Sequence, residues 1–289
     1  KFIKYNFDKA FILEQLKYQK NFSHISLQYD ITNKKIIGCL TSRLLCGFIN
    51  KQKLFISFMD FLCIREKYNK SNTGYNQIYT HYVKSRRLNA APIFLFKRTK
   101  KLKSLVPLTI YHSYSFNSDK LNKINVYLPN NISCHIIKSY NFQIFQDYCG
   151  TIEKKFKCFI IPNFTTIKNL IDKKILFLFI IKDGLNPVGI IIYKKTCISF
   201  NKKNVINCIA SYCSRGYEEI LKETITNTVV LLKKQIKFDI INFENKSFND
   251  ILIKKLLTKY TPKGKLLFCY YFYNFISRPF KSKNVFIID

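Results

Sequence analysis

The sequence predicts a mixed α/β protein built from two similar halves. Of its 289 residues, 47% are hydrophobic, including 27 Phe and 19 Tyr, which is enough for a core and excludes intrinsic disorder. The order hairpin, strand, helix, strand occurs twice along the chain, which indicates an internal duplication of one α/β unit. Because no linker rich in Gly or Pro separates the two units, we expect them to share one sheet or interface.

In the first unit, the spacing of apolar residues sets each expected element. Ala10, Leu13 and Leu16 lie near one face of a short helix. Two apolar runs separated by polar residues then predict a hairpin. A polar loop between the next strand and helix would present backbone N–H groups to a phosphate. The expected elements are a helix over residues 8–17, strands over 25–29, 35–45 and 55–65, a loop over 66–74 and a helix over 75–88.

The second unit repeats this order. Asp183, Gly184 and Pro187 lie in a clear turn between two strands. The helix that follows the third strand has the most regular pattern in the chain, because its apolar residues recur on one side. The expected elements are a helix over residues 166–172, strands over 174–182, 188–193 and 204–213, a helix over 217–235, and strands over 238–243 and 265–275.

The charge of the chain is strongly positive, with 49 Lys and Arg against 17 Asp and Glu and a formal net charge of +32. Lys, Asn, Ile, Phe and Tyr dominate, as in any protein encoded by an AT-rich genome, so the charge alone is weak support for nucleic-acid binding. The longest apolar run, at residues 175–181, is far shorter than the roughly 20 residues of a membrane span. No signal peptide opens the chain, and we expect a soluble, cytoplasmic protein.

The cysteines and histidines show no pattern of metal ligands. The 10 cysteines form no C-x-x-C pair, and the 4 histidines do not cluster with them. We therefore expect no zinc or other metal site. Most of the cysteines lie in apolar, strand-like runs, which fits free thiols in a reducing cytosol.

Six short motifs, spread over nearly the whole chain, occur in the order of one enzyme family. They are K-I-I-G-C-L-T at residues 35–41, F-M-D-F-L-C-I at 58–64, Y-H-S-Y-S-F-N at 111–117, F-D-I-I-N at 238–242, E-N-K-S-F at 244–248 and Y-Y-F-Y-N-F at 270–275. They resemble K-L-V-G-F-I-S/T, E-I-N-F-L-C-V, Y-W-H-R-S-L-N, F-D-V-F-N, E-N-K-T-F and Y-Y-L-Y-N-W of the N-myristoyltransferases. Each motif is weak alone, and the shared order carries the resemblance.

This resemblance implies a fold of two fused acetyltransferase-like (GNAT) halves with a pseudo-twofold arrangement. Residues 1–128 would bind the acyl-CoA, and residues 129–289 would bind the peptide, with the C-terminus returning to the active site. The implied reaction moves myristate from myristoyl-CoA, a co-substrate rather than a cofactor, to the N-terminal glycine amine of a protein or peptide. The resemblance implies no metal, and we expect a monomer.

The resemblance also implies catalytic roles for a few residues. The backbone N–H groups of Phe61 and Leu62, freed by a bulge, would hold the oxyanion, and donors of this kind contribute roughly 3–4 kcal/mol. Asn117 would help to hold the incoming glycine. The C-terminal α-carboxylate, here on Asp289, would be the base, and an amine with a pKa of about 7.7–8.0 needs only a modest one. The alternatives are that Phe61 and Leu62 are core residues only and that the apolar tail is a simple edge strand.

The binding residues implied by the resemblance include two departures from the family. Asn69 and Asn72 replace two arginines of the phosphate loop, so we expect weaker binding of the CoA phosphates. Lys263 replaces an acidic residue, so the preferred peptide is expected to differ. The implied acyl-CoA residues are Phe61, Leu62, Cys63, Ile64, Lys67, Asn69, Lys70, Ser71, Asn72, Thr73 and Gly74, and the implied peptide residues are Tyr111, Asn117, Tyr193 and Tyr212.

Two other functions stay open beside this one. The altered phosphate loop favours a non-catalytic binding protein. Such a protein would keep the fold but no longer bind acyl-CoA. The sequence also has no match to the family's N-terminal F-W-x-T-Q-P motif, which indicates a trimmed chain or a fragment. A protein that binds nucleic acid is favoured by charge alone, and its affinity would depend steeply on salt.

Overall fold

The computed structural model describes residues 3–5, 9–16, 23–68, 72–88, 91–121 and 128–289. In its first part, the predicted hairpin, third strand and helices are present. The elements there are β1 (Ile3–Tyr5), α1 (Lys9–Leu16), β2 (His24–Asp30), β3 (Lys35–Ile49), β4 (Gln52–Ile64), the single turn η2 (Glu66–Tyr68), α2 (Thr73–Arg87), β5 (Ile93–Arg98), β6 (Thr109–Asn117) and α3 (Ser118–Leu121).

The second part contains the predicted elements together with several that the sequence pattern did not indicate. Gly184 has a positive φ of 56° in the predicted turn, where glycine avoids the steric cost of that conformation. The elements are β7 (Ile132–Ile136), η3 (Ser139–Asn141), α4 (Gln143–Lys155), β8 (Cys158–Ile161), α5 (Phe164–Asp172), β9 (Leu176–Asp183), β10 (Asn186–Phe200), β11 (Lys203–Cys213), α6 (Glu218–Lys233), β12 (Ile240–Glu244), α7 (Asn249–Lys259), β13 (Gly264–Tyr273), η4 (Ser282–Asn284) and β14 (Val285–Ile287).

Local chemistry explains where some of these elements begin and which face they bury. Helix α5 begins after Asn163, whose side-chain oxygen accepts a hydrogen bond from Thr166 N at 2.7 Å, as in an N-cap. Helix α4, which was not predicted, buries Phe145, Cys149 and Ile152 on one face, at a spacing that fits a helix. In the described part of the chain, no helix is long and apolar enough to cross a membrane.

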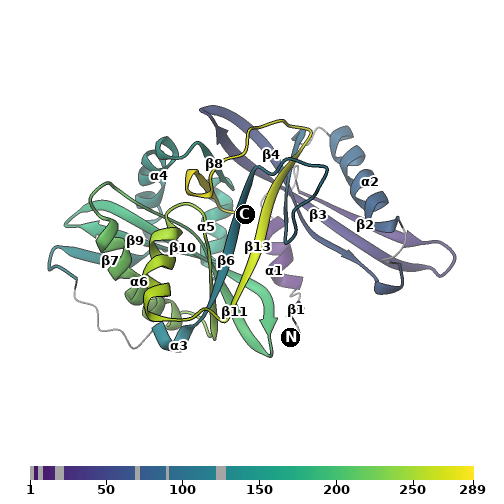
Figure 1. The fold of residues 1–289 in the computed structure, drawn as a ribbon. Coiled ribbons are helices and arrows are strands. Elements are labelled where there is room, and N and C mark those ends of the chain that lie inside the picture. Colours follow the sequence, from purple (N-terminus) through teal and green to yellow (C-terminus); the bar gives the residue numbers. More distant parts are fainter. Residues whose placement is uncertain (1–2, 6–8, 17–22, 69–71, 89–90, 122–127) are drawn as a thin grey trace.

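The strands form one mixed sheet of fourteen strands in which the two halves exchange strands. The order is β14-β8-β3-β4-β5-β13-β6-β12-β11-β10-β9-β7, with β1 on β10 and β2 on β3. Strand β6, from the first part, pairs with β12 of the second part, and β13 returns to pair with both β5 and β6. Figure 1 shows β6 and β13 side by side between two lobes, so the halves share one sheet, as predicted. The proposed division at residues 128 and 129 stays a prediction.

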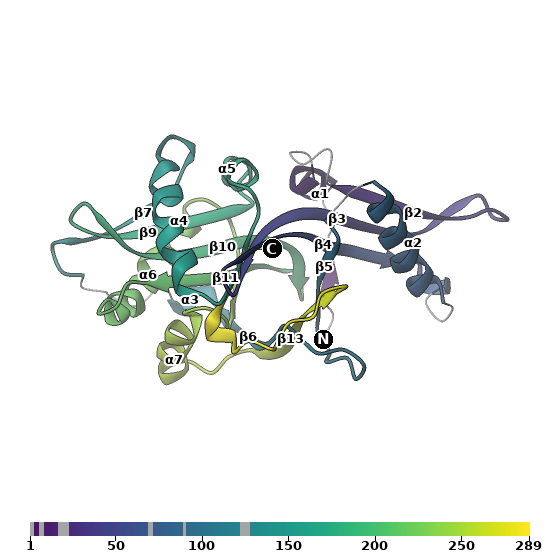
Figure 2. The ribbon, with the colours of Figure 1, turned by 90° about the horizontal axis from the view of Figure 1, so that it is seen from above.

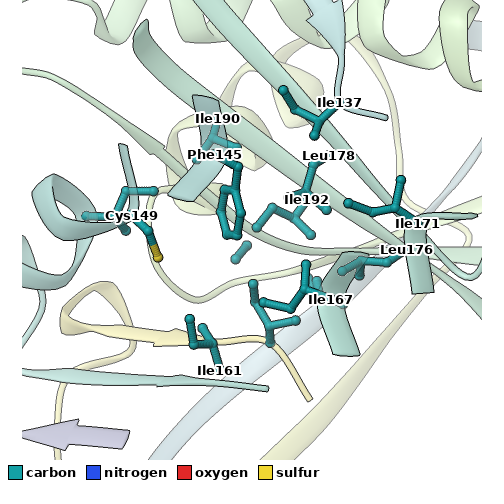
Figure 3. Packing of buried hydrophobic residues seen from close by; sticks show 14 of the residues in the cluster. Ile137, Phe145, Cys149, Ile161, Ile167, Ile171, Leu176, Leu178, Ile190 and Ile192 are labelled. Atoms are coloured by element: carbon teal, nitrogen blue, oxygen red, sulfur yellow. The ribbon is translucent and has the colours of Figure 1, made fainter. Parts of the chain in front are cut away.

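The largest hydrophobic cluster extends from the second lobe to the centre of the molecule. Around Phe145 of α4 it gathers Ile167 of α5 and the inward face of β9 and β10 (Figure 3). The same cluster contains Phe286 and Ile288 of the chain's last segment, and Phe61 of the first lobe packs against it. The core therefore connects the tail with strand β4.

The last residues of the sequence form a buried strand and not an exposed end. β14 pairs in parallel with β8, and its three side chains are buried. Ile288 N then donates to Ile160 O at 2.9 Å, which extends this pairing by one residue. The chain ends in the middle of the molecule, between the two lobes (Figures 1 and 2).

The burial of the tail leads to a prediction for Phe286, whose side chain is fully buried and stacks on Phe159 with ring centroids 5.4 Å apart. Phe286→Ala should lower the free energy of unfolding by about 3–5 kcal/mol, the usual cost of removing a buried phenyl ring. Urea unfolding followed by circular dichroism measures this loss. As a control, Tyr140→Ala should leave stability nearly unchanged, because Tyr140 is 83% exposed. An equal loss in both variants would contradict a buried tail.

Candidate active site

A β-bulge interrupts the pairing of β3 and β4 at Phe61 and Leu62. Thr41 pairs with Asp60 and Cys39 with Cys63, so two residues of β4 lie opposite one residue of β3. Phe61 has a positive φ of 53°, a conformation that non-glycine residues rarely adopt. The bulge takes both residues out of the regular register, at the position where the family resemblance implies the oxyanion donors.

Strands β4 and β5 separate at this bulge. They pair in parallel as far as Met59 and Phe96. Beyond that point β4 stays paired with β3, whereas β5 stays paired with β13. Lys97 of β5 is opposite Tyr270 of β13. The ladder shared by β4 and β5 therefore ends just before the bulge of β4 and before Lys97 of β5.

Asp60 lies directly before the bulge and already binds one of the two expected donors. Its Oδ1 accepts a hydrogen bond from Phe61 N at 2.9 Å, and its Oδ2 lies 3.2 Å from Arg43 Nη1. The side chain of Arg43 is only 3% exposed and lies over the Phe58 ring. The bulge thus carries a carboxylate that is neutralised by a buried guanidinium.

A buried network of charged and hydroxyl groups lies across β5, β6, β12 and β13. Glu244 accepts from Lys97 Nζ at 2.6 Å on one oxygen, and its other oxygen lies 2.8 Å from Lys246 Nζ. Tyr111 also donates to Glu244, at 3.2 Å, and Lys246 donates to the Tyr270 hydroxyl at 3.2 Å. Glu244 and Lys246 are almost completely shielded from solvent. Every charge in this network has a partner of opposite sign, which offsets the cost of its burial.

Asp289, the last residue of the sequence, joins this network through both its side chain and its main chain. Tyr270 donates to Asp289 Oδ2 at 2.9 Å, and Lys97 Nζ lies 3.7 Å from the same oxygen. Lys194, from β10, donates to the main-chain oxygen of Asp289. Three strands therefore hold the end of the tail, and two of the contacts come from lysines.

Burial and the neighbouring charges lower the pKa values of two carboxyl groups and one lysine of this network. Burial raises the pKa of Glu244, but Lys246 and Lys97 outweigh it and hold this pKa below the ordinary value. Burial likewise opposes ionisation of the Asp289 side chain, yet Lys97 and Lys246 hold its pKa far below the ordinary range. Burial lowers the pKa of Lys194 to about 8, although Asp289 acts in the opposite direction. The two carboxylates are therefore ionised at neutral pH, and Lys194 is close to its own titration.

The residues expected to bind acyl-CoA follow the bulge along the chain. Cys63 and Ile64 end β4, Lys67 lies exposed in the turn η2, and Asn72 directly precedes α2. Thr73 and Gly74 lie in the first turn of that helix, and the N-terminus of a helix is a place where backbone N–H groups and the helix dipole suit a phosphate. The remaining three, Asn69, Lys70 and Ser71, lie outside the described residues.

The residues expected to bind the peptide lie in different places. Tyr111 belongs to the buried network, and Tyr212 packs against Phe248 near the tail. Tyr193 is fully buried and hydrogen-bonds Thr228 in the core of the second lobe. Its expected role in a peptide-binding groove stays a prediction, and its burial does not favour that role. Asn117 ends β6, six residues beyond Tyr111 and so about 20 Å away along the strand. The structure therefore brings Tyr111 together with Asp289, but it does not bring Asn117 or Tyr193 to them.

Most of the charged residues of the site were not predicted from the sequence. A signal was present at Arg43, which is a single charge within an apolar strand, whereas Lys97 and Lys194 each begin a pair of basic residues after an apolar run. Such residues are rarely buried unless they are paired. The residues missed are Arg43, Asp60, Lys97, Lys194, Glu244, Lys246 and Tyr270. Among the described residues, no group of three or more His, Cys, Asp or Glu side chains could hold a metal.

Comparisons with known proteins find similarity in structure only. No sequence-family profile matches the chain, and no curated protein matches it by sequence. Two structures of Saccharomyces cerevisiae N-myristoyltransferase with bound myristoyl-CoA, one of them also with inhibitors, match 97% of this chain. Their TM-scores are 0.74 and 0.77 at 12% identity, and 73% and 74% of those chains are covered. A GCN5-related N-acetyltransferase from Anabaena variabilis matches with a TM-score of 0.55 at 11% identity, over 93% of this chain and 72% of that one.

The chain has the double GNAT fold. The sequence predicts an internal duplication and a shared sheet or interface, and the structure has one mixed sheet; the exchange of β6 and β13 was not predicted. The fold class expected from the sequence is thereby confirmed.

The buried network leads to a prediction for Glu244. Glu244→Gln removes the charge that neutralises Lys97 and Lys246, so we expect the free energy of unfolding to fall by about 3–5 kcal/mol at pH 7. Urea unfolding measures this fall. The matched control is Glu219→Gln, which removes an exposed partner of Lys222 and should cost less than about 1 kcal/mol.

The pH dependence of this loss has a definite sign. The pKa of Glu244 is lowered in the folded state, so its ionised form stabilises the fold fully above the ordinary value of 4.5. That contribution decreases as the pH falls from 4.5 through the folded-state pKa. The difference in stability between the wild type and Glu244→Gln should therefore shrink on acidification, and a difference that grows would contradict an ionised, paired Glu244.

Proposed function

We propose that this protein is an N-myristoyltransferase that moves a myristoyl group from myristoyl-CoA to the N-terminal glycine amine of a protein or peptide. The observation that carries the proposal is the placement of Asp289 against two partly buried lysines at the centre of a double GNAT fold. A terminal segment inserted into that position supplies a carboxylate at the site where the two lobes meet. The matched yeast enzyme with bound myristoyl-CoA supports the choice of substrates.

The proposed reaction begins with the thioester held at the β4 bulge. Leu62 N–H and Phe61 N–H would polarise the thioester carbonyl, and the second of these becomes available when Asp60 turns fully to Arg43. Lys67 and the first turn of α2 would bind the CoA phosphates. The glycine amine attacks the carbonyl carbon directly, and the C–S bond breaks without a covalent enzyme intermediate. The nitrogen loses a proton as the amide forms, and this proton passes to the sulfur, so that CoA leaves as its thiol.

The proposed base is the α-carboxylate of Asp289 and not its side chain. The side-chain carboxylate is bound by Tyr270 and Lys97 and has a pKa far below the ordinary range, which makes it a poor proton acceptor. Lys194 binds the main-chain oxygen and would orient the α-carboxylate toward the ammonium group of the peptide. A proton moves from that ammonium group to the carboxylate before the amine attacks.

A non-catalytic binder with the same fold is the second candidate, and Asp60 favours it. Its carboxylate accepts from the N–H group of Phe61, and a fixed negative charge at that place opposes an oxyanion. Such a protein would still bind acyl-CoA or a peptide. Turnover therefore separates the two candidates, whereas binding does not.

The test is mass spectrometry of a peptide with an N-terminal glycine after incubation with the protein and myristoyl-CoA. We expect myristate on the peptide amine. Deletion of Asp289, or extension of the chain by one glycine so that the α-carboxylate becomes an amide, should each lower the rate by about 10²–10⁴-fold, the usual contribution of a general base. Lys283→Ala, at an exposed position near the tail, is the control and should keep the wild-type rate.

Each outcome has a clear meaning for the two candidates. Product that is lost in both tail variants and kept in Lys283→Ala supports the transferase with its terminal base. Product that persists in the glycine-extended chain would contradict the role of the α-carboxylate. Binding of myristoyl-CoA without any product in the wild type would favour the non-catalytic binder.

A further inference from the structure

Two cysteines lie directly opposite each other beside the β4 bulge. Cys39 of β3 pairs with Cys63 of β4 in the antiparallel register. Directly opposed residues have Cα atoms about 4.5–5.5 Å apart, within the range of about 4.4–6.8 Å that a disulfide spans. Among the strand pairs that the structure describes, no other cysteine has a cysteine as its partner.

The two thiols are both accessible and chemically unequal. Each is half-buried, whereas Cys149 and Cys158, for example, are fully buried. A hydrogen bond from Cys63 lowers the pKa of Cys39, and the same contact raises the pKa of Cys63. The pair therefore combines a thiol that ionises readily with a neighbour that stays protonated. Thiolate character and exposure are what make a cysteine react with peroxide.

Cys39 also contacts the bulge itself. In its thiol form, Cys39 Sγ donates to Phe61 O at 3.7 Å. That carbonyl belongs to the same peptide group as Leu62 N–H, and in a trans peptide the two groups point in opposite directions. In the thiol form, this contact helps to orient the peptide that carries one of the proposed oxyanion donors.

We propose that Cys39 and Cys63 form an oxidation site, in which a peroxide converts the two thiols into a cross-strand disulfide and thereby releases the Phe61–Leu62 peptide from its orienting contact. The disulfide carries no S–H group, so Phe61 O loses this donor. Formation of the disulfide follows from the geometry of the strands alone. Its effect on turnover rests on the proposed transferase function.

The oxidation is balanced with hydrogen peroxide as the oxidant. The Cys39 thiolate attacks one peroxide oxygen, the O–O bond breaks, and a sulfenic acid and hydroxide form. The Cys63 sulfur then attacks the sulfenic sulfur, the S–S bond forms, and the hydroxyl group leaves as water after taking the Cys63 proton. The two thiols together lose two electrons and two protons, and the peroxide is reduced to two molecules of water.

The experiment treats the full chain with hydrogen peroxide and maps its peptides by mass spectrometry without reduction. We expect one peptide pair joined through Cys39 and Cys63, which separates again after dithiothreitol. Cys46→Ser is the matched control, because it removes a half-buried thiol of the same strand, and it should form the same disulfide. Absence of the Cys39–Cys63 peptide pair from the oxidised wild type would overturn the proposal.

The second readout is the ratio of acyl-transfer rates after and before peroxide treatment, which removes any difference in basal rate between variants. This ratio should fall in the wild type and in Cys46→Ser, by up to the about 100-fold that complete loss of one oxyanion donor costs, and should recover with dithiothreitol. In Cys39→Ser it should stay near one. An equal fall in Cys39→Ser would overturn the effect on turnover. If the untreated wild type shows no transfer, the proposed function fails, while the peptide map still decides whether the disulfide forms.

Discussion

The position of Glu244 between the buried Lys246 and the partly buried Lys97 is the interaction on which the arrangement of the site depends. Lys97 comes from β5, Glu244 from β12 and Lys246 from the segment before α7, so one carboxylate joins strands of both lobes. Removing either type of charge would leave the other unpaired in a medium of low polarity, which is far more costly than losing a surface ion pair. Because Lys97 also faces Asp289, the same network fixes the tail at the centre of the sheet.

The internal duplication places a bulge at equivalent points of the two lobes, but the second lobe fills the space beside it. In that lobe the parallel pairing of β11 and β12 ends at Cys208 and Phe243, and β11 has one extra residue, Ile209, directly after it. Asn249 of α7 spans the diverging strands there, since its Nδ2 donates to the main-chain oxygens of Cys208 and Glu244. In the first lobe the corresponding bulge contacts the side chain of Asp60 instead, whose carboxylate accepts a hydrogen bond from Phe61 N.

The sequence predicts the sheet better than it predicts the site. The spacing of apolar residues along the chain predicts the strands of the hairpins and helix α6, because it depends only on residues close in sequence. Helix α4 has a helical pattern too, but its buried Phe, Tyr and Cys side chains suit strands equally well in a chain this rich in aromatic residues. The charged network could not be predicted from the sequence, because residues 97, 244 and 289 are distant in the chain. They become neighbours only through the exchange of β6 and β13. The bulge was located only through a resemblance of motifs.

The numbers of positive and negative groups in the site are balanced. This balance fits a reaction in which a negative charge is lost from one group and appears on another, so that the total stays the same. Four cations, Arg43, Lys97, Lys194 and Lys246, face three side-chain carboxylates, those of Asp60, Glu244 and Asp289. In the proposed reaction, the α-carboxylate of Asp289 is the fourth negative charge. It becomes neutral when it takes a proton from the peptide ammonium group, and the thioester oxygen then gains a negative charge. The cations therefore compensate a negative charge at both stages, and fixed groups of this kind need no reorganisation as the transition state forms.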